Sequence, residues 1–142
     1  FVIAGRLHRQ IGEKMLPLFV YGTLRASQSQ SWALAGRLLT PARMQGRLWR
    51  LPGGEPALEI SRKHGWVVGE LVDLQDQADL AFLEQIVAVQ QHGLVSQAVR
   101  VQLGMRAVRA QVWCANERHL RQLQARPLKT SDWSKVSTRR AF

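Results

Sequence analysis

The residues with the clearest chemical potential form the segment 19–25, Phe-Val-Tyr-Gly-Thr-Leu-Arg. An apolar run that starts at Leu18 reads as a β-strand, and the Tyr-Gly-Thr sequence ends it in a tight loop. Gly22 can take backbone angles that are closed to other residues, and it lets a ligand approach the main chain. Thr23 to Arg25 then offer backbone N–H groups just past the strand end. Clustered N–H groups bind anions, so this loop predicts an anion-binding site.

The other reactive side chains form no competing pattern. No two of the four histidines (His8, His64, His92 and His119) have the spacing of metal ligands. No Ser/His/Asp or Cys/His order stands out. The single cysteine, Cys114, cannot form an internal disulfide, which favours a reducing, cytoplasmic location and a buried structural thiol. We therefore expect neither a metal nor a cofactor.

The elements that must position this loop are mostly strands. Alternating or continuous apolar runs predict strands at Leu16–Tyr21, Met44–Leu51, Ala57–Ser61 and Trp66–Leu74, and a hairpin from Val95–Leu103 and Ala107–Ala115. Gly69 lies inside one of these strands and predicts a bulge or close backbone packing. The strands outnumber the helices too strongly for an alternating α/β order, so the fold class is α+β.

Two short helices are expected. The segment 76–88 has Leu80, Leu83 and Val87 on one face, with Asp76 or Asp79 able to cap its start. The segment 27–34 predicts a second helix, with Ser29 or Ser31 as the cap. The tail from Asn116 reads as helical or irregular.

The whole chain has 142 residues, which suits one domain. We assign 15–142 to this domain and treat 1–14, which precede Met15, as an N-terminal extension or the remnant of a tag. The apolar runs are far shorter than the roughly 20 residues that cross a membrane.

The net charge is +10, and the excess within 15–142 lies entirely from Arg100 onward. There, ten Lys or Arg residues accompany two acidic residues, Glu117 and Asp132. A basic face of this kind is compatible with nucleic acid. However, the basic residues are dispersed and no nucleic-acid motif accompanies them, so a solvated face is the simpler interpretation.

Several motifs, in order, resemble those of the γ-glutamylcyclotransferase-like family. The Tyr21-Gly22-Thr23-Leu24 loop is similar to the family's Tyr-Gly-Ser/Thr-Leu signature. Further similarities follow at Gly46-Arg47-Leu48-Trp49, Gly54-Glu55-Pro56-Ala57-Leu58, Val68-Gly69-Glu70-Leu71 and Val112-Trp113. Together they span Leu16 to about Ala115. The resemblance implies a small mixed β-barrel flanked by short helices.

The resemblance also implies a pocket for a γ-glutamyl group. Backbone amides of Tyr21, Gly22, Thr23 and Leu24 would hold the substrate carboxylate. The side chains placed around the pocket are Arg25, Pro56, Glu70 and Trp113. In the family, the substrate's α-amine attacks its own γ-carbonyl and releases 5-oxoproline. One glutamate with a pKa raised by burial can serve as both base and acid.

The sequence departs from the family where that glutamate belongs, in a Leu-Asp-x-x-Glu-Gly motif. If Leu83-Glu84 stands for Leu-Asp, the acid position is Val87, which cannot transfer protons. If Glu84 is the acid, Ala81 replaces the aspartate and Gln85 the glycine. On a helix the two positions differ by a rise of about 4.5 Å and a rotation of about 60°. We favour the first alignment, which resembles a small bacterial subgroup without the acid and with a similar Asp132-Trp133.

Three functions follow as alternatives. The first is a cyclotransferase that acts on γ-glutamyl amines or peptides, with Glu84 as its catalytic carboxylate. The second is a non-catalytic protein that binds a carboxylate-bearing metabolite at the same loop. The third is a nucleic-acid partner that uses the basic C-terminal third.

Overall fold

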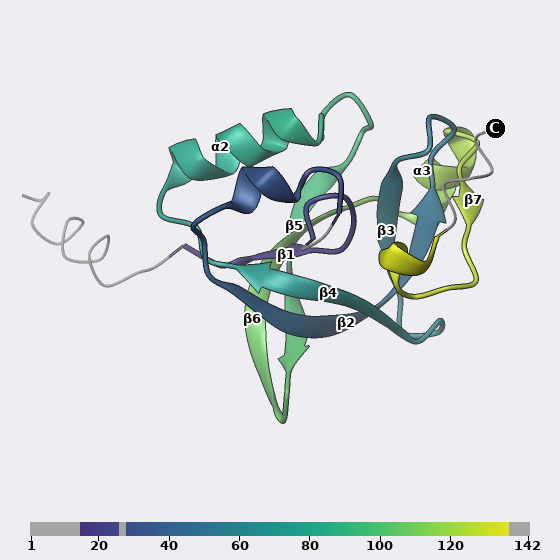
Figure 1. Ribbon diagram of the computed structural model, residues 1–142. Helices are drawn as coiled ribbons and strands as arrows, with labels where there is room; N and C mark the ends of the chain where they lie inside the picture. Colours follow the sequence, from purple (N-terminus) through teal and green to yellow (C-terminus); the bar gives the residue numbers. More distant parts are fainter. Residues whose placement is uncertain (1–14, 26–27, 137–142) are drawn as a thin grey trace, which may run out of the picture.

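The computed structural model describes residues 15–25 and 28–136 (Figure 1). The predicted extension at 1–14 lies outside the described residues. In chain order the elements are β1 (Leu18–Val20), η1 (Ser31–Leu34), β2 (Leu39–Arg50), β3 (Pro56–Ile60), β4 (Trp66–Val72), α2 (Gln77–Ile86), β5 (Val95–Leu103), β6 (Arg106–Cys114), α3 (Glu117–Gln122), β7 (Arg126–Pro127) and η2 (Trp133–Lys135).

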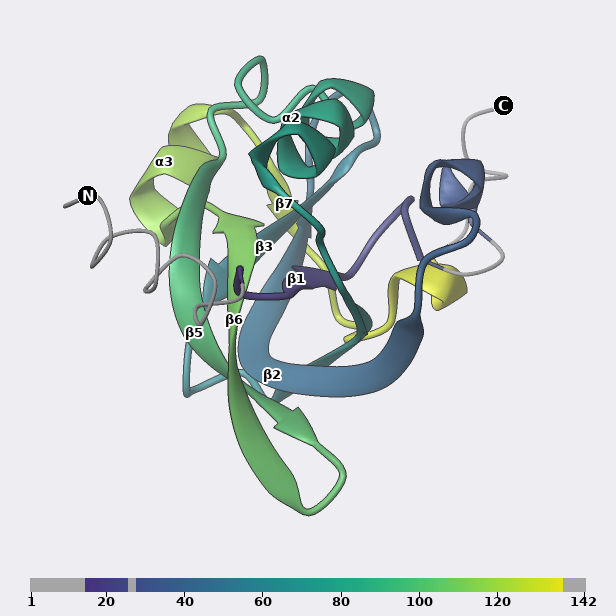
Figure 2. The ribbon, with the colours of Figure 1, turned by 90° about the vertical axis from the view of Figure 1, so that its left-hand side faces the viewer.

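Five strands close a mixed barrel in the order β2-β4-β1-β6-β5. The antiparallel pairs are β2–β4, β1–β4 and β5–β6, and β1 runs parallel to β6. The barrel closes where Arg43 of β2 pairs with Gln102 of β5. In Figure 2 the β5–β6 hairpin extends beyond the rest of the barrel. The predicted α+β class and the small barrel with flanking helices are thus confirmed.

Strand β2 belongs to two sheets. Its first half pairs with β4, and its second half, from Gly46 to Arg50, pairs with β3. The short β7 adds to the same end through Trp49 and Arg50. The sequence predicted only the second half, from Met44. The strand in fact begins at Leu39, and Pro41 lies within it opposite Glu70.

Strand β1 is buried on both faces, because its alternating side chains enter two different cores. Leu18 and Val20 pack in a cluster with Leu80 and Leu83 of α2. Phe19 belongs to the cluster of the barrel strands. A side chain at Gly69 of β4 would place its Cβ 2.3 Å from the carbonyl oxygen of Val20. The close backbone packing expected at Gly69 is therefore present, and it brings β4 against β1.

The helices differ from the prediction in their ends. The Asp76 carboxylate caps α2 by accepting a hydrogen bond from the Asp79 N–H at 2.9 Å. The helix ends at Ile86, two residues early, because Ala88 takes a left-handed conformation with φ of +51°. Around 27–34 the described residues form only the 3-10 turn η1, and Gln30 precedes it without a side-chain cap. The predicted serine cap was wrong.

The C-terminal tail folds back along the barrel. Asn116 caps α3, and Val68 of β4 donates a backbone hydrogen bond to the Ser131 carbonyl at 2.9 Å. Trp133 is buried with the barrel strands. Within 15–25 and 28–136, no helix has the length and apolar character needed to cross a membrane.

Candidate functional site

A pocket of about 400 Å³ lies at the end of β1. We call one side the barrel wall, formed by Tyr21, Gly22, Thr23, Leu24, Pro56 and Trp113. The other side, the helix wall, is formed by Ile86, Val87, Ala88, Gln91 and His92. The four loop residues singled out from the sequence thus line one pocket together with Pro56 and Trp113.

The loop presents consecutive backbone donors. Within the described chain, no hydrogen bond uses the backbone N–H of Gly22, Thr23 or Leu24. The next N–H, that of Arg25, is occupied, because it donates to the Gly22 carbonyl at 3.0 Å and closes the turn. Three adjacent N–H groups on pocket-lining residues match the donor set of an anion-binding nest.

Gly22 is required for space. It does not have a positive φ, so its backbone angles are open to other residues, contrary to the reason proposed from the sequence. A Cβ at this position would lie 2.3 Å from Cγ of Pro56. The Pro56 ring therefore packs directly on the Gly22 backbone and joins two motifs that are far apart in the chain.

Tyr21 and Trp113 are joined across the barrel wall. The Tyr21 hydroxyl donates to the Trp113 carbonyl oxygen at 2.7 Å. Burial, with a smaller contribution from the nearby Cys114, raises the pKa of the Tyr21 phenol well above its usual value. The phenol therefore stays protonated and serves as a fixed donor. Cys114 is itself a free, buried thiol, as predicted.

Gln30 links the barrel wall to the helix wall. Its backbone N–H donates to the Thr23 carbonyl at 2.8 Å, and its side-chain Oε1 accepts from the Thr23 hydroxyl. Its Nε2 donates to the carbonyl of Ile86 at 2.9 Å. One side chain thus fixes the loop relative to the end of α2.

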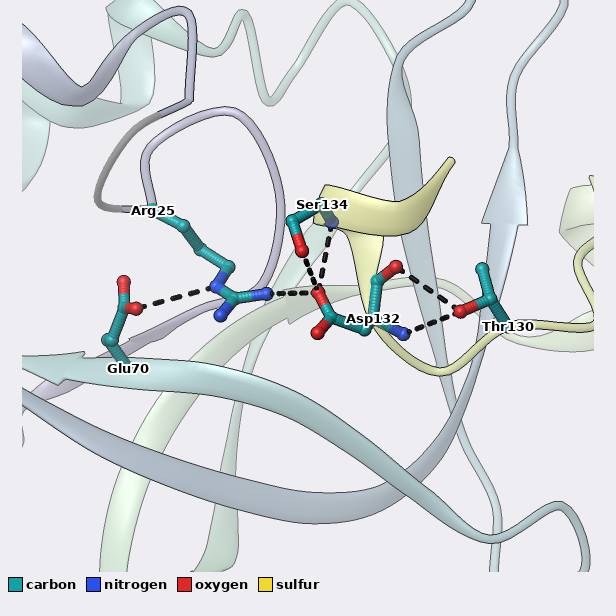
Figure 3. A network of polar contacts seen from close by, with 5 residues as sticks. All are labelled: Arg25, Glu70, Thr130, Asp132 and Ser134. Atoms are coloured by element: carbon teal, nitrogen blue, oxygen red, sulfur yellow. Dashed lines mark hydrogen bonds and ion pairs between the residues drawn. The ribbon is translucent and has the colours of Figure 1, made fainter. Parts of the chain in front are cut away.

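Arg25 and Glu70 lie outside the pocket lining and join a separate network (Figure 3). Arg25 Nη1 donates to Asp132 Oδ1 at 2.7 Å, and its Nε lies 3.5 Å from Glu70 Oε2. The backbone N–H and hydroxyl of Ser134 also donate to Asp132 Oδ1, at 3.0 and 2.6 Å. Burial disfavours the charged form of Asp132, but the hydrogen bonds from Ser134 and Arg25 outweigh it and lower its pKa. The network anchors the far end of the loop to the C-terminal segment.

The helix wall carries no carboxylate. Val87 caps the end of α2 and lines the pocket. Glu84 is half-buried and is not among the residues that line the pocket. Of the two alignments considered for the family acid, the one with Val87 is the one that places its residue at the pocket.

Two lining residues with acid–base chemistry were not singled out as site residues from the sequence. Glu55 Oε2 lies 4.0 Å from Nε2 of His92, and both residues line the pocket. Glu55 directly precedes Pro56 in a motif already noted, which is a usable signal. His92 follows α2 in a turn, and nothing local marks it. In 15–25 and 28–136, no group of three or more His, Cys, Asp or Glu residues could hold a metal ion.

Comparison with known proteins identifies the family of this chain. The sequence model of the family "gamma-glutamyl cyclotransferase, AIG2-like" matches residues 18–135. The chain belongs to this family. No curated protein matches it.

Several solved structures share the fold. YkqA from Bacillus subtilis superposes with a TM-score of 0.64 at 24% identity, over 84% of this chain and 40% of that one. An AIG2-like protein from Mus musculus gives 0.60 at 20%, over 87% and 92%. A gamma-glutamyl cyclotransferase gives 0.57 at 16%, over 71% and 67%. The present chain thus spans less than half the length of YkqA.

Proposed function

We propose that the pocket binds a γ-glutamyl amine or γ-glutamyl peptide and holds a carboxylate of this ligand on the N–H groups of Gly22, Thr23 and Leu24. The observation that carries the proposal is the set of three adjacent N–H groups, without acceptors in the described chain, on residues that line a pocket. Family membership supplies the class of ligand.

The pocket suits a small metabolite in size and lining. A volume of about 400 Å³ falls in the range of small-molecule sites, roughly 300 to 1,000 Å³. Leu24, Ile86 and Val87 provide apolar surface, whereas Thr23 and Gln30 provide polar groups near the loop. Few polar groups in a largely apolar cavity are what fix the orientation of a small ligand.

Turnover to 5-oxoproline requires a group that moves protons, and Val87 cannot do this. Glu84, the catalytic candidate from the sequence, would have to act from outside the pocket lining. The second candidate function, binding without turnover, is favoured by Val87 in the helix wall. The two functions share the same ligand site and differ only in whether 5-oxoproline is formed.

Calorimetry with γ-glutamyl-alanine tests the ligand proposal. We expect saturable binding, and we expect the analogue whose α-carboxylate is replaced by a carboxamide to bind about 10- to 100-fold more weakly. This loss corresponds to about 1.5–3 kcal/mol for hydrogen bonds to a charged group. Free alanine is the control, since it lacks the γ-glutamyl group. Equal affinity for the acid and the carboxamide would contradict the proposed role of the loop.

A nucleic-acid role for the basic C-terminal third and a cytoplasmic location stay predictions. The nucleic-acid alternative has a simple signature, because binding through phosphates weakens steeply with salt. Failure to retain DNA or RNA at low salt would remove it.

A further inference from the structure

We propose that Glu55 and His92 are the proton-transfer pair of this pocket and replace the carboxylate that Val87 does not supply. The inference rests on the proposed γ-glutamyl ligand and adds the groups that would turn it over. Among the described residues that line the pocket, these two carry the acid–base side chains, apart from the buried Tyr21 phenol, which donates to a carbonyl oxygen.

The distance between the two side chains suits a shared substrate nitrogen. Glu55 Oε2 and His92 Nε2 are 4.0 Å apart, too far for a direct hydrogen bond. A nitrogen about 2.8 Å from both atoms would bridge them at an angle of about 90°. A substrate nitrogen placed between the two side chains can therefore exchange a proton with either of them.

Glu55 is held by the loop between β2 and β3. Leu51 N–H donates to the Glu55 carbonyl at 2.8 Å, and Gly54 N–H donates to the Leu51 carbonyl at the same distance. A Cβ on Gly53 would lie 2.7 Å from Glu55 Oε1. The carboxylate thus rests over the bare backbone of Gly53, and a side chain there would displace it.

His92 is held by the turn that follows α2. Its N–H lies 3.3 Å from the carbonyl oxygens of Ala88 and Val89. Ala88 and Gly93 both have positive φ, +51° and +71°. This backbone path returns the chain toward the pocket and places His92 opposite Glu55.

The position of the loop assigns the two roles. The α-carboxylate and the α-ammonium of a γ-glutamyl group are on the same carbon. With the carboxylate on Gly22 to Leu24, we assign the ammonium to Glu55, which directly precedes the Pro56 that packs on Gly22. Glu55 therefore accepts a proton from the α-ammonium, and His92 delivers a proton to the leaving amine.

The proton count closes without any other reactant. The α-nitrogen loses one proton to Glu55 and attacks the γ-carbonyl carbon, which forms the ring C–N bond. The same nitrogen loses a second proton as the tetrahedral intermediate collapses. The bond to the leaving amine breaks with its electron pair on that nitrogen. The two protons pass through Glu55 and His92 to that amine, so the products are 5-oxoproline and the released amine in its protonated form.

The experiment measures 5-oxoproline and binding in parallel on the full chain. Purified protein is incubated with γ-glutamyl-alanine, the product is quantified by chromatography, and affinity is measured by calorimetry. The variants are Glu55→Gln and His92→Asn, with exposed Glu117→Gln and His64→Asn as matched controls. Thermal unfolding verifies that each variant is folded. Glu84→Gln tests the rival acid.

We expect each of Glu55→Gln and His92→Asn to lower the rate about 10²- to 10⁴-fold, the usual contribution of a general acid or base. Affinity should stay within about tenfold, and the controls should match the parent protein. Binding without product would overturn the pair but leave the ligand proposal standing. Product formation that depends on Glu84, or that neither substitution lowers, would also overturn it. Absence of binding would refute both proposals.

Discussion

The two walls of the pocket are built in different ways. The barrel wall is held by contacts between distant segments: Pro56 on Gly22, the Tyr21 hydroxyl on Trp113, and beyond the loop Arg25 on Asp132. The helix wall is held mainly by the hydrogen bonds of one helix end and a left-handed Ala88. A wall fixed from many directions keeps its shape when a side chain changes. A helix end such as the one that presents Val87 can carry a different side chain without altering the contacts that hold the wall opposite.

The largest expected effect tests whether a carboxylate introduced into the helix wall can take over proton transfer. In the inactive Glu55→Gln/His92→Asn background, Val87→Glu should raise 5-oxoproline formation by at least about 100-fold. It places a carboxylate at a pocket-lining position. Chromatographic assay of the product measures the gain. Gln85→Glu, on the exposed side of α2, is the control and should give none. A Val87→Glu protein that is folded but inactive would show that position 87 is not the acid position.

The second prediction introduces a steric clash into the barrel wall. Gly22→Ala should lower the free energy of unfolding by about 1–3 kcal/mol, because its Cβ would lie 2.3 Å from Cγ of Pro56. Urea unfolding measures this loss, and affinity for γ-glutamyl-alanine should fall with it. Adding Pro56→Ala removes the clash and should recover part of the stability. Additive effects of the two substitutions would contradict direct packing.

A somewhat smaller effect concerns the anchor behind the loop. Asp132→Asn should cost about 1.5–2 kcal/mol, because Arg25 and Ser134 lose a charged acceptor. The pKa of Asp132 is lowered in the folded protein. The stabilisation is therefore complete above the ordinary carboxyl pKa of about 4 and is lost as pH falls through the lowered pKa.

Unfolding curves of the two proteins across acidic pH measure this effect of Asp132. The curves should converge at the acid end. The exposed pair of Glu117 with Arg121 is the control, and Glu117→Gln should leave stability nearly unchanged. A difference that is constant with pH would rule out the charge of Asp132 as its cause.

The smallest effect uncouples the two walls. Gln30→Leu removes the side-chain hydrogen bonds to Thr23 and Ile86, keeps the backbone hydrogen bond to Thr23, and should cost about 1 kcal/mol. Without these two side-chain bonds the loop is no longer fixed relative to the helix end. The affinity for γ-glutamyl-alanine should therefore fall several-fold even at temperatures where the variant is fully folded. Calorimetry beside thermal unfolding separates the two. Gln85→Leu, at an exposed position of α2, is the matched control.

The sequence predicted the features that depend on local patterns and missed those that depend on contacts between distant segments. The loop at 21–24, the strands around it and the Asp76 cap are local patterns, so their residue types were sufficient. The reason for Gly22 was not local, because it depends on Pro56, 34 positions further on. The pairing of Glu55 with His92 depends on how α2 ends, and the left-handed Ala88 has no signature in its residue type. The first half of β2 was missed because a proline inside it argues against a strand.

The closure of the barrel has a consequence for its motions. The β2–β4 and β5–β6 pairs each run over many residues, whereas β2–β5 and β1–β6 are each paired in register at a single residue pair. The barrel therefore consists of two well-paired halves that are joined along two thin seams. Tyr21 to Leu24 belong to one half, and Trp113 belongs to the other. A ligand that contacts both halves would hold them together at the β1–β6 boundary. Backbone amides beside this boundary should then exchange their hydrogens more slowly when the ligand is bound.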